Sequence, residues 1–261
     1  MASPFSYLKL PQHPPKPRRT GLFIPGDSGI PLRVQEDFLE ENHDLVDYMK
    51  ITGHVRLLGR YPTDWFERKI GLYNKYGIGT FPGGISFEVA LLQDQAPRFF
   101  RTLKELGFTG VEISEDVVPP MSATARREII AEARMAGLAV FTEVGRKFPT
   151  GSLTSEELVK LIRSDLESGA HMVTIERSEI VQLKESNPQV LIETAKAVGF
   201  DKVIFESHLP GPDLMVWLIR TLGPEVNLMG HAEYCALAHD CRLGMNRSVE
   251  YTFLTAKGGK V

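Results

Sequence analysis

A repeat of about 30 residues constrains the fold of this chain more than any other feature of its sequence. An amphipathic run ends at each of four regularly spaced glycines, Gly107, Gly137, Gly169 and Gly199. Each glycine fits the position just after a helix, where a positive φ is favourable for glycine. An apolar run follows each glycine and ends in a glutamate, at Glu112, Glu143, Glu176 and Glu206. One period is therefore one strand–helix unit.

The same alternation extends over most of the chain. Eight short β-rich runs are predicted, at 21–25, 45–51, 77–81, 110–113, 139–144, 172–175, 202–205 and 226–229. Amphipathic helical runs lie between them, and one starts at Thr154 and Glu157 with capping-box spacing. Such alternation implies right-handed crossovers and a parallel sheet. Eight units predict a (β/α)8 TIM barrel, with an open doubly wound sheet as the alternative.

Composition excludes several classes of protein. The 261 residues carry 30 Lys+Arg against 33 Asp+Glu, so net charge gives no case for a nucleic-acid partner. The two cysteines, Cys235 and Cys241, exclude a disulfide scaffold and a four-cysteine metal site. No apolar run approaches the roughly 18 residues of a membrane helix. The N-terminus shows no apolar signal core, so we expect a cytoplasmic protein.

Proline marks the start of the chain as a separate segment. Residues 11–19 have the sequence PQHPPKPRR, which excludes regular helix or sheet. We therefore expect a proline-rich N-terminal arm over residues 1–20, the barrel over 21–250 and a C-terminal tail over 251–261. The sequence leaves room for a homo-oligomer, although no helix face stands out as an interface.

Acidic residues gather where the predicted strands end, which is where parallel barrels carry their active sites. Besides the four glutamates of the repeat, the first strand is followed directly by Asp27. Like charges so close raise each other's pKa unless a cation neutralises them. Hard oxygen ligands suit Mg²⁺, so we expect a magnesium site here. The alternative is that the acids pair with basic neighbours and bind no metal.

Basic residues accompany these acids. They are Lys50 on the second strand, Arg146 and Lys147 after the fifth, and Arg177 after the sixth. Cations in such a mouth suit a small anionic substrate. The pair Gly83-Gly84 offers backbone N–H groups to a phosphate, although a plain turn explains it equally well. Lys50 or Lys147 also suits a Schiff-base aldolase, and the residues alone do not choose between these uses. We expect His54, His208 and His231 to be polar rim residues.

A set of strand-end motifs occurs in a fixed order over residues 20–247. They are Gly26-Asp27-Ser28-Gly29, Val46-Asp47-Tyr48-Met49-Lys50, Phe81-Pro82-Gly83-Gly84, Val111-Glu112-Ile113-Ser114, Thr142-Glu143-Val144-Gly145-Arg146-Lys147, Ile175-Glu176, Ile204-Phe205-Glu206 and Val226-Asn227-Leu228. Together they resemble the phosphosulfolactate synthase family. The resemblance implies a (β/α)8 barrel and a Mg²⁺-dependent addition of sulfite to phosphoenolpyruvate, on the route to coenzyme M.

The resemblance also implies roles for individual residues. Lys147 is expected to stabilise an enolate or donate a proton. From their positions on and at the end of strands, Lys50 and Glu206 are expected as further catalytic residues. The expected metal ligands are Asp27, Glu112, Glu143 and Glu176. The expected substrate-binding residues are Gly83, Gly84, Arg146, Arg177, Asn227 and Arg242.

Some positions depart from the pattern of that family. Ser28 stands where the family has lysine, Ser178 follows an arginine displaced by one position, Met229 replaces a glycine, and Asn246 stands at an expected arginine. Several of these changes remove or move anion-binding groups. Two alternatives to sulfite addition therefore remain besides the aldolase: another small anion or thiol as the nucleophile, and a non-catalytic barrel with a scaffold or stress-associated role.

Overall fold

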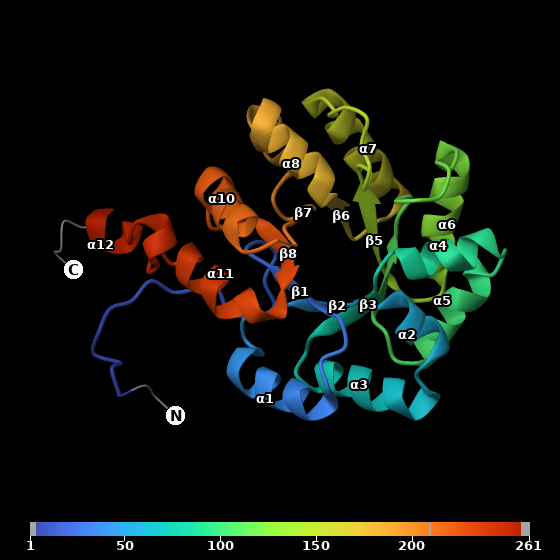
Figure 1. Cartoon of the computed structure of the whole chain (residues 1–261), viewed down its shortest axis with the longest axis horizontal. Coiled ribbons are helices and arrows are strands. Elements are labelled where there is room, and N and C mark those ends of the chain that lie inside the picture. The colour runs from blue at the N-terminus through green and yellow to red at the C-terminus, as the bar shows by residue number, and fades with distance from the viewer. Residues whose placement is uncertain (1–3, 209, 257–261) are drawn as a thin grey trace.

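The eight predicted strands all form, and they pair in parallel into one sheet (Figure 1). This computed structural model describes residues 4–208 and 210–256. The strands are β1 (Phe23–Asp27), β2 (Tyr48–Ile51), β3 (Gly79–Pro82), β4 (Gly110–Ile113), β5 (Ala139–Val144), β6 (Met172–Ile175), β7 (Val203–Glu206) and β8 (Asn227–His231). The sheet order is β3-β2-β1-β8-β7-β6-β5-β4, so β3 and β4 are its two ends.

Threonine residues join these two end strands. The backbone N–H of Thr109 donates to the carbonyl oxygen of Thr80 at 3.1 Å. The backbone N–H of Thr80 donates to the Thr109 hydroxyl at 2.7 Å. The sheet is thereby nearly closed into a ring, and the predicted (β/α)8 TIM barrel is confirmed.

Helices surround the strands on the outside (Figure 1). They are α1 (Leu32–Asn42), α2 (His54–Gly59), α3 (Thr63–Lys75), α4 (Ile85–Leu92), α5 (Ala96–Glu105), α6 (Ala123–Met135), α7 (Ser155–Ser168), α8 (Arg177–Ser186), α9 (Gln189–Val198), α10 (Asp213–Leu222), α11 (Cys235–Arg242) and α12 (Thr252–Ala256). The predicted capping box of Thr154 and Glu157 begins α7. The four repeat glycines all have a positive φ, between 79° and 104°. They therefore end helices, as the repeat predicts.

Alternating side chains of each strand point into the barrel or toward the helices. An inner apolar cluster contains Leu22, Ile24, Phe81, Phe141, Met172, Ile204 and Met229. The rings of Phe81 and Phe141 stack with centroids 4.3 Å apart and fill the middle of the barrel. The next inward positions after Phe141 and Ile204 are Glu143 and Glu206. The interior therefore changes from apolar to charged at the carboxyl ends of the strands.

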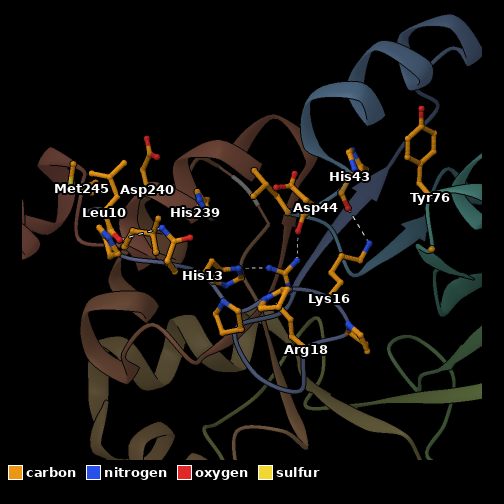
Figure 2. A pocket seen from close by; sticks show the side chains of 18 residues that line it. Leu10, His13, Lys16, Arg18, His43, Asp44, Tyr76, His239, Asp240 and Met245 are labelled. Carbon is orange, nitrogen blue, oxygen red and sulfur yellow. Dashed lines mark hydrogen bonds between the residues drawn. The ribbon is translucent and has the colours of Figure 1, made fainter. Parts of the chain in front are cut away.

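The N-terminal arm lies against the opposite, amino-terminal end of the barrel. Residues 9–15 form neither helix nor strand. The arm is held by Arg18, whose Nε lies 2.9 Å from Asp47 Oδ1, and by Lys16, whose Nζ donates to the His43 carbonyl oxygen at 3.0 Å. Figure 2 shows the cavity of 960 Å³ that the arm encloses with α11 and the α1–β2 connection. Lys16 and Arg18, which line this cavity, thus already have partners in the His43 carbonyl group and Asp47.

Both ends of the chain extend beyond the barrel. Residues 252–256, within the segment expected to be a tail, form the short helix α12. Residues 1–3 of the expected arm and 257–261 of the expected tail lie outside the described residues. Over the ranges that are described, no helix combines the length and the apolar character that crossing a membrane requires.

Acid is expected to destabilise this fold through His13 of the arm. Burial, and then the nearby Arg18 guanidinium, lower the pKa of His13 from its ordinary 6.5 to about 4. Between these values the unfolded chain binds a proton at His13 that the folded chain does not bind. The free energy of unfolding therefore falls as pH decreases through this window, and this loss is absent above it. Urea unfolding at neutral pH and at about pH 5 should show a smaller fall for His13→Asn than for the wild type; equal falls would contradict the assignment.

Candidate active site

Three glutamates converge at the carboxyl ends of neighbouring strands. Glu143 lies in β5, Glu206 ends β7, and Glu176 follows β6 as the residue that caps α8. One carboxylate oxygen of each lies within 4.8 Å of those of the other two. All three side chains are buried. The sequence prediction that these acids meet in one mouth is confirmed.

Two lysines flank this acidic cluster on different sides. Lys50 of β2 places its Nζ 2.9 Å from Glu112 Oε2 and 3.5 Å from Glu206 Oε1. Lys147, in the connection after β5, places its Nζ 2.6 Å from Asp116 Oδ2 and 3.6 Å from Glu176 Oε1. The ammonium groups and the carboxylates therefore form one continuous network across the mouth of the barrel.

A small cavity of 170 Å³ opens onto this network. Its walls are Lys50, Thr52, His54, Gly83, Gly84, Ile85, Glu112, Asp116, Lys147, Glu206 and His208. Its volume is well below the roughly 300–1,000 Å³ typical of sites for drug-sized ligands. The cavity therefore suits a small molecule, with charged groups on several sides of it.

Two consecutive glycines, Gly83 and Gly84, line the cavity, and both of their backbone amides already donate hydrogen bonds. The Gly84 N–H donates to Glu112 Oε2 at 2.7 Å, and the Gly83 N–H donates to the Ile51 carbonyl oxygen at 2.9 Å. Neither amide is therefore available to hold a phosphate, contrary to the expectation from the sequence. A Cβ atom at Gly84 would lie 2.7 Å from the Ser114 Cβ atom. Glycine at this position lets the start of α4 approach β4 closely.

Burial and mutual repulsion perturb the carboxylates. Burial raises the pKa of Glu143 well above its ordinary value, and Glu206 and Glu112 raise it further. Burial is also the main cause that raises the pKa of Glu112 and of Glu176. Glu206 is the exception, because Lys50 overcomes the effect of burial and holds the pKa of Glu206 below its ordinary value. Most of the cluster is thus ionised only when positive charge lies beside it.

The lysines are held in their charged form. Burial opposes the charge of Lys50, but Glu112 and then Glu206 raise its pKa above the ordinary value. Burial likewise opposes the charge of Lys147, and Glu143 and Asp116 raise the pKa of that side chain. A Schiff-base lysine needs a lowered pKa, so that a neutral amine attacks the carbonyl. These surroundings argue against the aldolase alternative and favour ammonium groups that bind or donate protons.

Oxygen atoms in the cluster fit a divalent cation. Within residues 4–208 and 210–256, both carboxylate oxygens of Glu143 and Oε1 of Glu112 are buried without a hydrogen-bond partner. Leaving such oxygens unpaired costs free energy, and a cation satisfies several of them at once. Mg²⁺ prefers carboxylate oxygens and keeps part of its water shell. Glu143, Glu176 and Glu206 would hold such an ion, with Glu112 beside them.

Asp27 lies outside this cluster, although the sequence places it among the metal ligands. Ile24 of the same strand faces the barrel interior, and Asp27, three residues later, faces the helices. Lys69 of α3 places its Nζ 2.5 Å from Asp27 Oδ2, and the Tyr73 hydroxyl donates to the same oxygen at 2.7 Å. Two backbone N–H groups donate to Oδ1. The Asp27 carboxylate therefore ties β1 to α3 and is corrected from ligand to structural residue.

Asn227 and Arg242 also lie away from the mouth, so their placement at a substrate there is wrong. Asn227 is the first residue of β8, and its side chain donates to the Val203 carbonyl oxygen at 3.1 Å and accepts from the Leu22 N–H at 2.9 Å. Arg242 of α11 donates to the Leu22 carbonyl oxygen at 3.0 Å. Both side chains instead join backbone groups at the amino-terminal end of the barrel.

The two remaining arginines border the cluster. Arg146 donates to the Val118 carbonyl oxygen at 3.2 Å and lines a separate cavity of 350 Å³ beside α6 and α7. Its guanidinium therefore does not line the small cavity. Arg177 begins α8, and its backbone N–H lies 3.4 Å from Glu206 Oε2. This arginine thus reaches the cluster through its main chain.

Asp116 is a buried residue of the site that the strand-end pattern misses. It lies three residues beyond the end of β4 and not at the end itself. The run Ser114-Glu115-Asp116 was the available signal, because polar residues directly after a barrel strand are candidates for the active-site end. The rim residues His54 and His208 both line the cavity. His208 Nδ1 lies 3.2 Å from Glu206 Oε1.

Comparison with known proteins places this chain in a family. The model described as (2R)-phospho-3-sulfolactate synthase (ComA) matches residues 11–247. A phosphosulfolactate synthase of Methanocaldococcus jannaschii is 35% identical over 221 residues, which are 80% of this chain and 84% of that protein. A phosphosulfolactate synthase of Methanothermobacter thermautotrophicus is 30% identical over 236 residues, which are 86% of this chain and 88% of that protein.

Solved structures show the same fold at low sequence identity. The sialic acid aldolase of Ruminococcus gnavus superposes with a TM-score of 0.57 at 9% identity, over 91% of this chain and 76% of that chain. Such a likeness extends to the barrel and not to its chemistry. The family assignment rests instead on the match along the sequence. The chain therefore belongs to the (2R)-phospho-3-sulfolactate synthase family and is an enzyme of the lyase or synthase type.

Proposed function

We propose that this chain adds sulfite to phosphoenolpyruvate with the help of Mg²⁺, giving phosphosulfolactate. The proposal is carried mainly by one observation: buried carboxylates with unpaired oxygens lie beside two ammonium groups at a cavity of 170 Å³. A phosphorylated three-carbon acid matches the small size of that cavity. The names of the relatives motivate sulfite as the second substrate.

The balance of charge supports a cation in the site. The cluster of described residues holds the carboxylates of Glu112, Asp116, Glu143, Glu176 and Glu206 against the ammonium groups of Lys50 and Lys147. When these carboxylates are ionised, an anionic substrate would meet strong repulsion from their excess of negative charge. When bound, Mg²⁺ supplies positive charge that stabilises the negative charge developing on the substrate carboxylate. Together with the lysines, that charge permits an anion to bind.

The two lysines have different roles in the proposed reaction, and Lys147 supplies the proton that the product requires. A lone pair on the sulfur of sulfite forms a bond to the methylene carbon of phosphoenolpyruvate, and the π electrons of the double bond move toward the carboxylate. Lys147, as an ammonium group at the cavity, donates a proton to the adjacent carbon that carries the phosphate. Lys50 stays protonated between Glu112 and Glu206 and stabilises negative charge on the substrate. The ammonium of Lys147 is restored by a proton from the solvent.

The direct test is turnover by the purified chain. Phosphoenolpyruvate, sulfite and Mg²⁺ together should yield a sulfonated phosphate ester, with sulfite consumed in equal amount. EDTA should stop the reaction, and added Mg²⁺ should restore it. An absence of turnover with sulfite would reject this substrate pair, and an absence with other small anions and thiols as well would reject the catalytic proposal.

Glu143→Gln is expected to abolish the response to Mg²⁺. Glutamine has nearly the shape of glutamate but lacks the charge that a divalent cation requires, and Glu143 provides two oxygens of the proposed site that accept no hydrogen bond. Calorimetric titration should show Mg²⁺ binding to the wild type and to Glu167→Gln, an exposed control on α7. Unchanged Mg²⁺ affinity in Glu143→Gln would remove Glu143 from the ligand set.

A further inference from the structure

A fully buried glutamate outside the cavity organises the connection after β4. Glu88 of α4 is 1% exposed. Its Oε1 accepts from the Ser114 hydroxyl and from the Asp116 N–H at 2.8 Å. Its Oε2 accepts from the N–H groups of Val117 and Val118, each at 3.0 Å. One carboxylate therefore fixes the path of residues 114–118, which have no helix or strand of their own.

That connection carries Asp116 to the cavity. The Asp116 side chain lines the cavity, and its Oδ2 lies 2.6 Å from Lys147 Nζ, the shortest of the contacts given for that ammonium group. Its other oxygen, Oδ1, is buried without a hydrogen-bond partner among the described residues. A buried carboxylate in this state holds its cationic partner firmly, because no competing donor draws it away.

The geometry points to a positioning relay that rests on the proposed function. We propose that Glu88 fixes the backbone at Asp116, and that Asp116 in turn fixes the Lys147 ammonium where it donates its proton. Glu88 and Asp116 are positioning residues, because both act through Lys147. The single conformation of the relay matters because Lys147 is itself 35% exposed and stands on a connecting segment with no regular structure.

Asp116→Asn is the central test of the relay. Asparagine keeps the size of the side chain but removes its charge. The variant should lower kcat by about 10- to 100-fold, as loss of an outer supporting residue typically does, and should leave KM for phosphoenolpyruvate unchanged. The variant Glu115→Gln changes the neighbouring acid of the same connection, which instead accepts from the Met121 N–H, and should keep the wild-type kcat.

A double-mutant cycle separates positioning from other roles. If Asp116 acts only through Lys147, then Asp116→Asn will not lower the residual kcat of Lys147→Met any further. A full additional loss in that background would overturn the relay. A raised KM with an unchanged kcat would also overturn it, because Asp116 would then act in substrate binding.

Glu88→Gln tests the first step. A glutamine amide cannot accept hydrogen bonds at its nitrogen, so at least one backbone N–H of the connection loses its partner. We expect faster hydrogen exchange at residues 116–118, together with a loss of kcat at unchanged KM. Faster exchange with the wild-type kcat would overturn the role of Glu88, and so would unchanged exchange.

The relay is also testable without turnover. If the wild type does not convert phosphoenolpyruvate and sulfite, the proposed function fails, and the relay is judged on stability and exchange alone. Urea unfolding of Asp116→Asn, Lys147→Met and the double variant should then be non-additive, with the hydrogen-exchange change of Glu88→Gln retained. Additive effects would overturn the relay independently of the reaction.

Discussion

Lys147→Met is expected to lower kcat by roughly 10²–10⁴-fold, the contribution of a positioned proton donor. Methionine has a similar length and no charge, so the change removes the ammonium group that lies 2.6 Å from Asp116 and borders the cavity. Binding of Mg²⁺ should persist, because Lys147 forms ion pairs with Glu176 and Glu143, would compete with a cation for them, and provides no ligand itself. The measurement is kcat at saturating substrate, together with a calorimetric Mg²⁺ titration.

The control for this variant is Lys160→Met, which removes an exposed ammonium group from α7. It should keep the wild-type kcat and fold. Circular dichroism should show that Lys147→Met keeps its secondary structure, because the Lys147 side chain is 35% exposed and not part of the core. Wild-type turnover by a folded Lys147→Met would remove this lysine from the mechanism.

Lys69→Met is expected to lower the free energy of unfolding by about 3–5 kcal/mol, the cost of leaving a buried charge without its partner. Lys69 is 0% exposed and Asp27 is 1% exposed, and their charged atoms lie 2.5 Å apart between β1 and α3. A loss of this size is a large part of the roughly 5–15 kcal/mol that stabilises an ordinary domain. Urea unfolding with linear extrapolation measures it.

The double variant Asp27→Asn with Lys69→Met distinguishes charge from packing. With both charges removed, no buried carboxylate is left unpaired, and stability should return most of the way to the wild-type value. The single and double variants losing the same stability would show that the lysine stem, and not the ion pair, is what matters. Mg²⁺ affinity should stay unchanged in the double variant, because Asp27 lies outside the acidic cluster.

The barrel was predictable because its signals are local. Glycine at a helix end, an apolar strand and a glutamate after it recur within each unit, and each of these signals, such as Gly169 with its φ of 104°, occupies only a few neighbouring residues of the sequence. The observed limits of the strands differ from the predicted limits by up to three residues, as at β2, which begins at Tyr48 and not at residue 45. Those limits are set by sheet register, which the sequence of a single strand does not contain.

The site residues were predictable from the sequence only where it was clear which face of the strand, inward or outward, each side chain occupies. Glu112, Glu143 and Glu206 occupy inward positions of their strands, so the prediction from the repeat that they lie close together is correct. The prediction that Asp27 is a metal ligand is wrong because a shift of one residue turns a strand side chain to the other face of the sheet. The prediction that Asn227 binds substrate is wrong because Asn227 is the first residue of β8 and therefore lies at the opposite end of the barrel.

Residues beyond the strand ends needed the tertiary structure. Asp116 reaches the cavity because the connection after β4 folds around Glu88. Four hydrogen bonds to one carboxylate over a separation of up to 30 residues leave no periodic trace in the sequence. Hydrogen bonds of this kind become visible only once α4 and β4 lie side by side.

The ring of strands is held by backbone ladders at seven junctions, and between β3 and β4 the hydroxyl of Thr109 adds to the backbone hydrogen bond between Thr109 and Thr80. Gly84 and Glu112 face each other across this same junction at the far end of the strands. Both residues line the small cavity. The hydrogen bonds that close the ring and two walls of the cavity therefore lie at the same junction of strands, so that a substitution at Thr109 is expected to alter the cavity as well as the closure of the barrel.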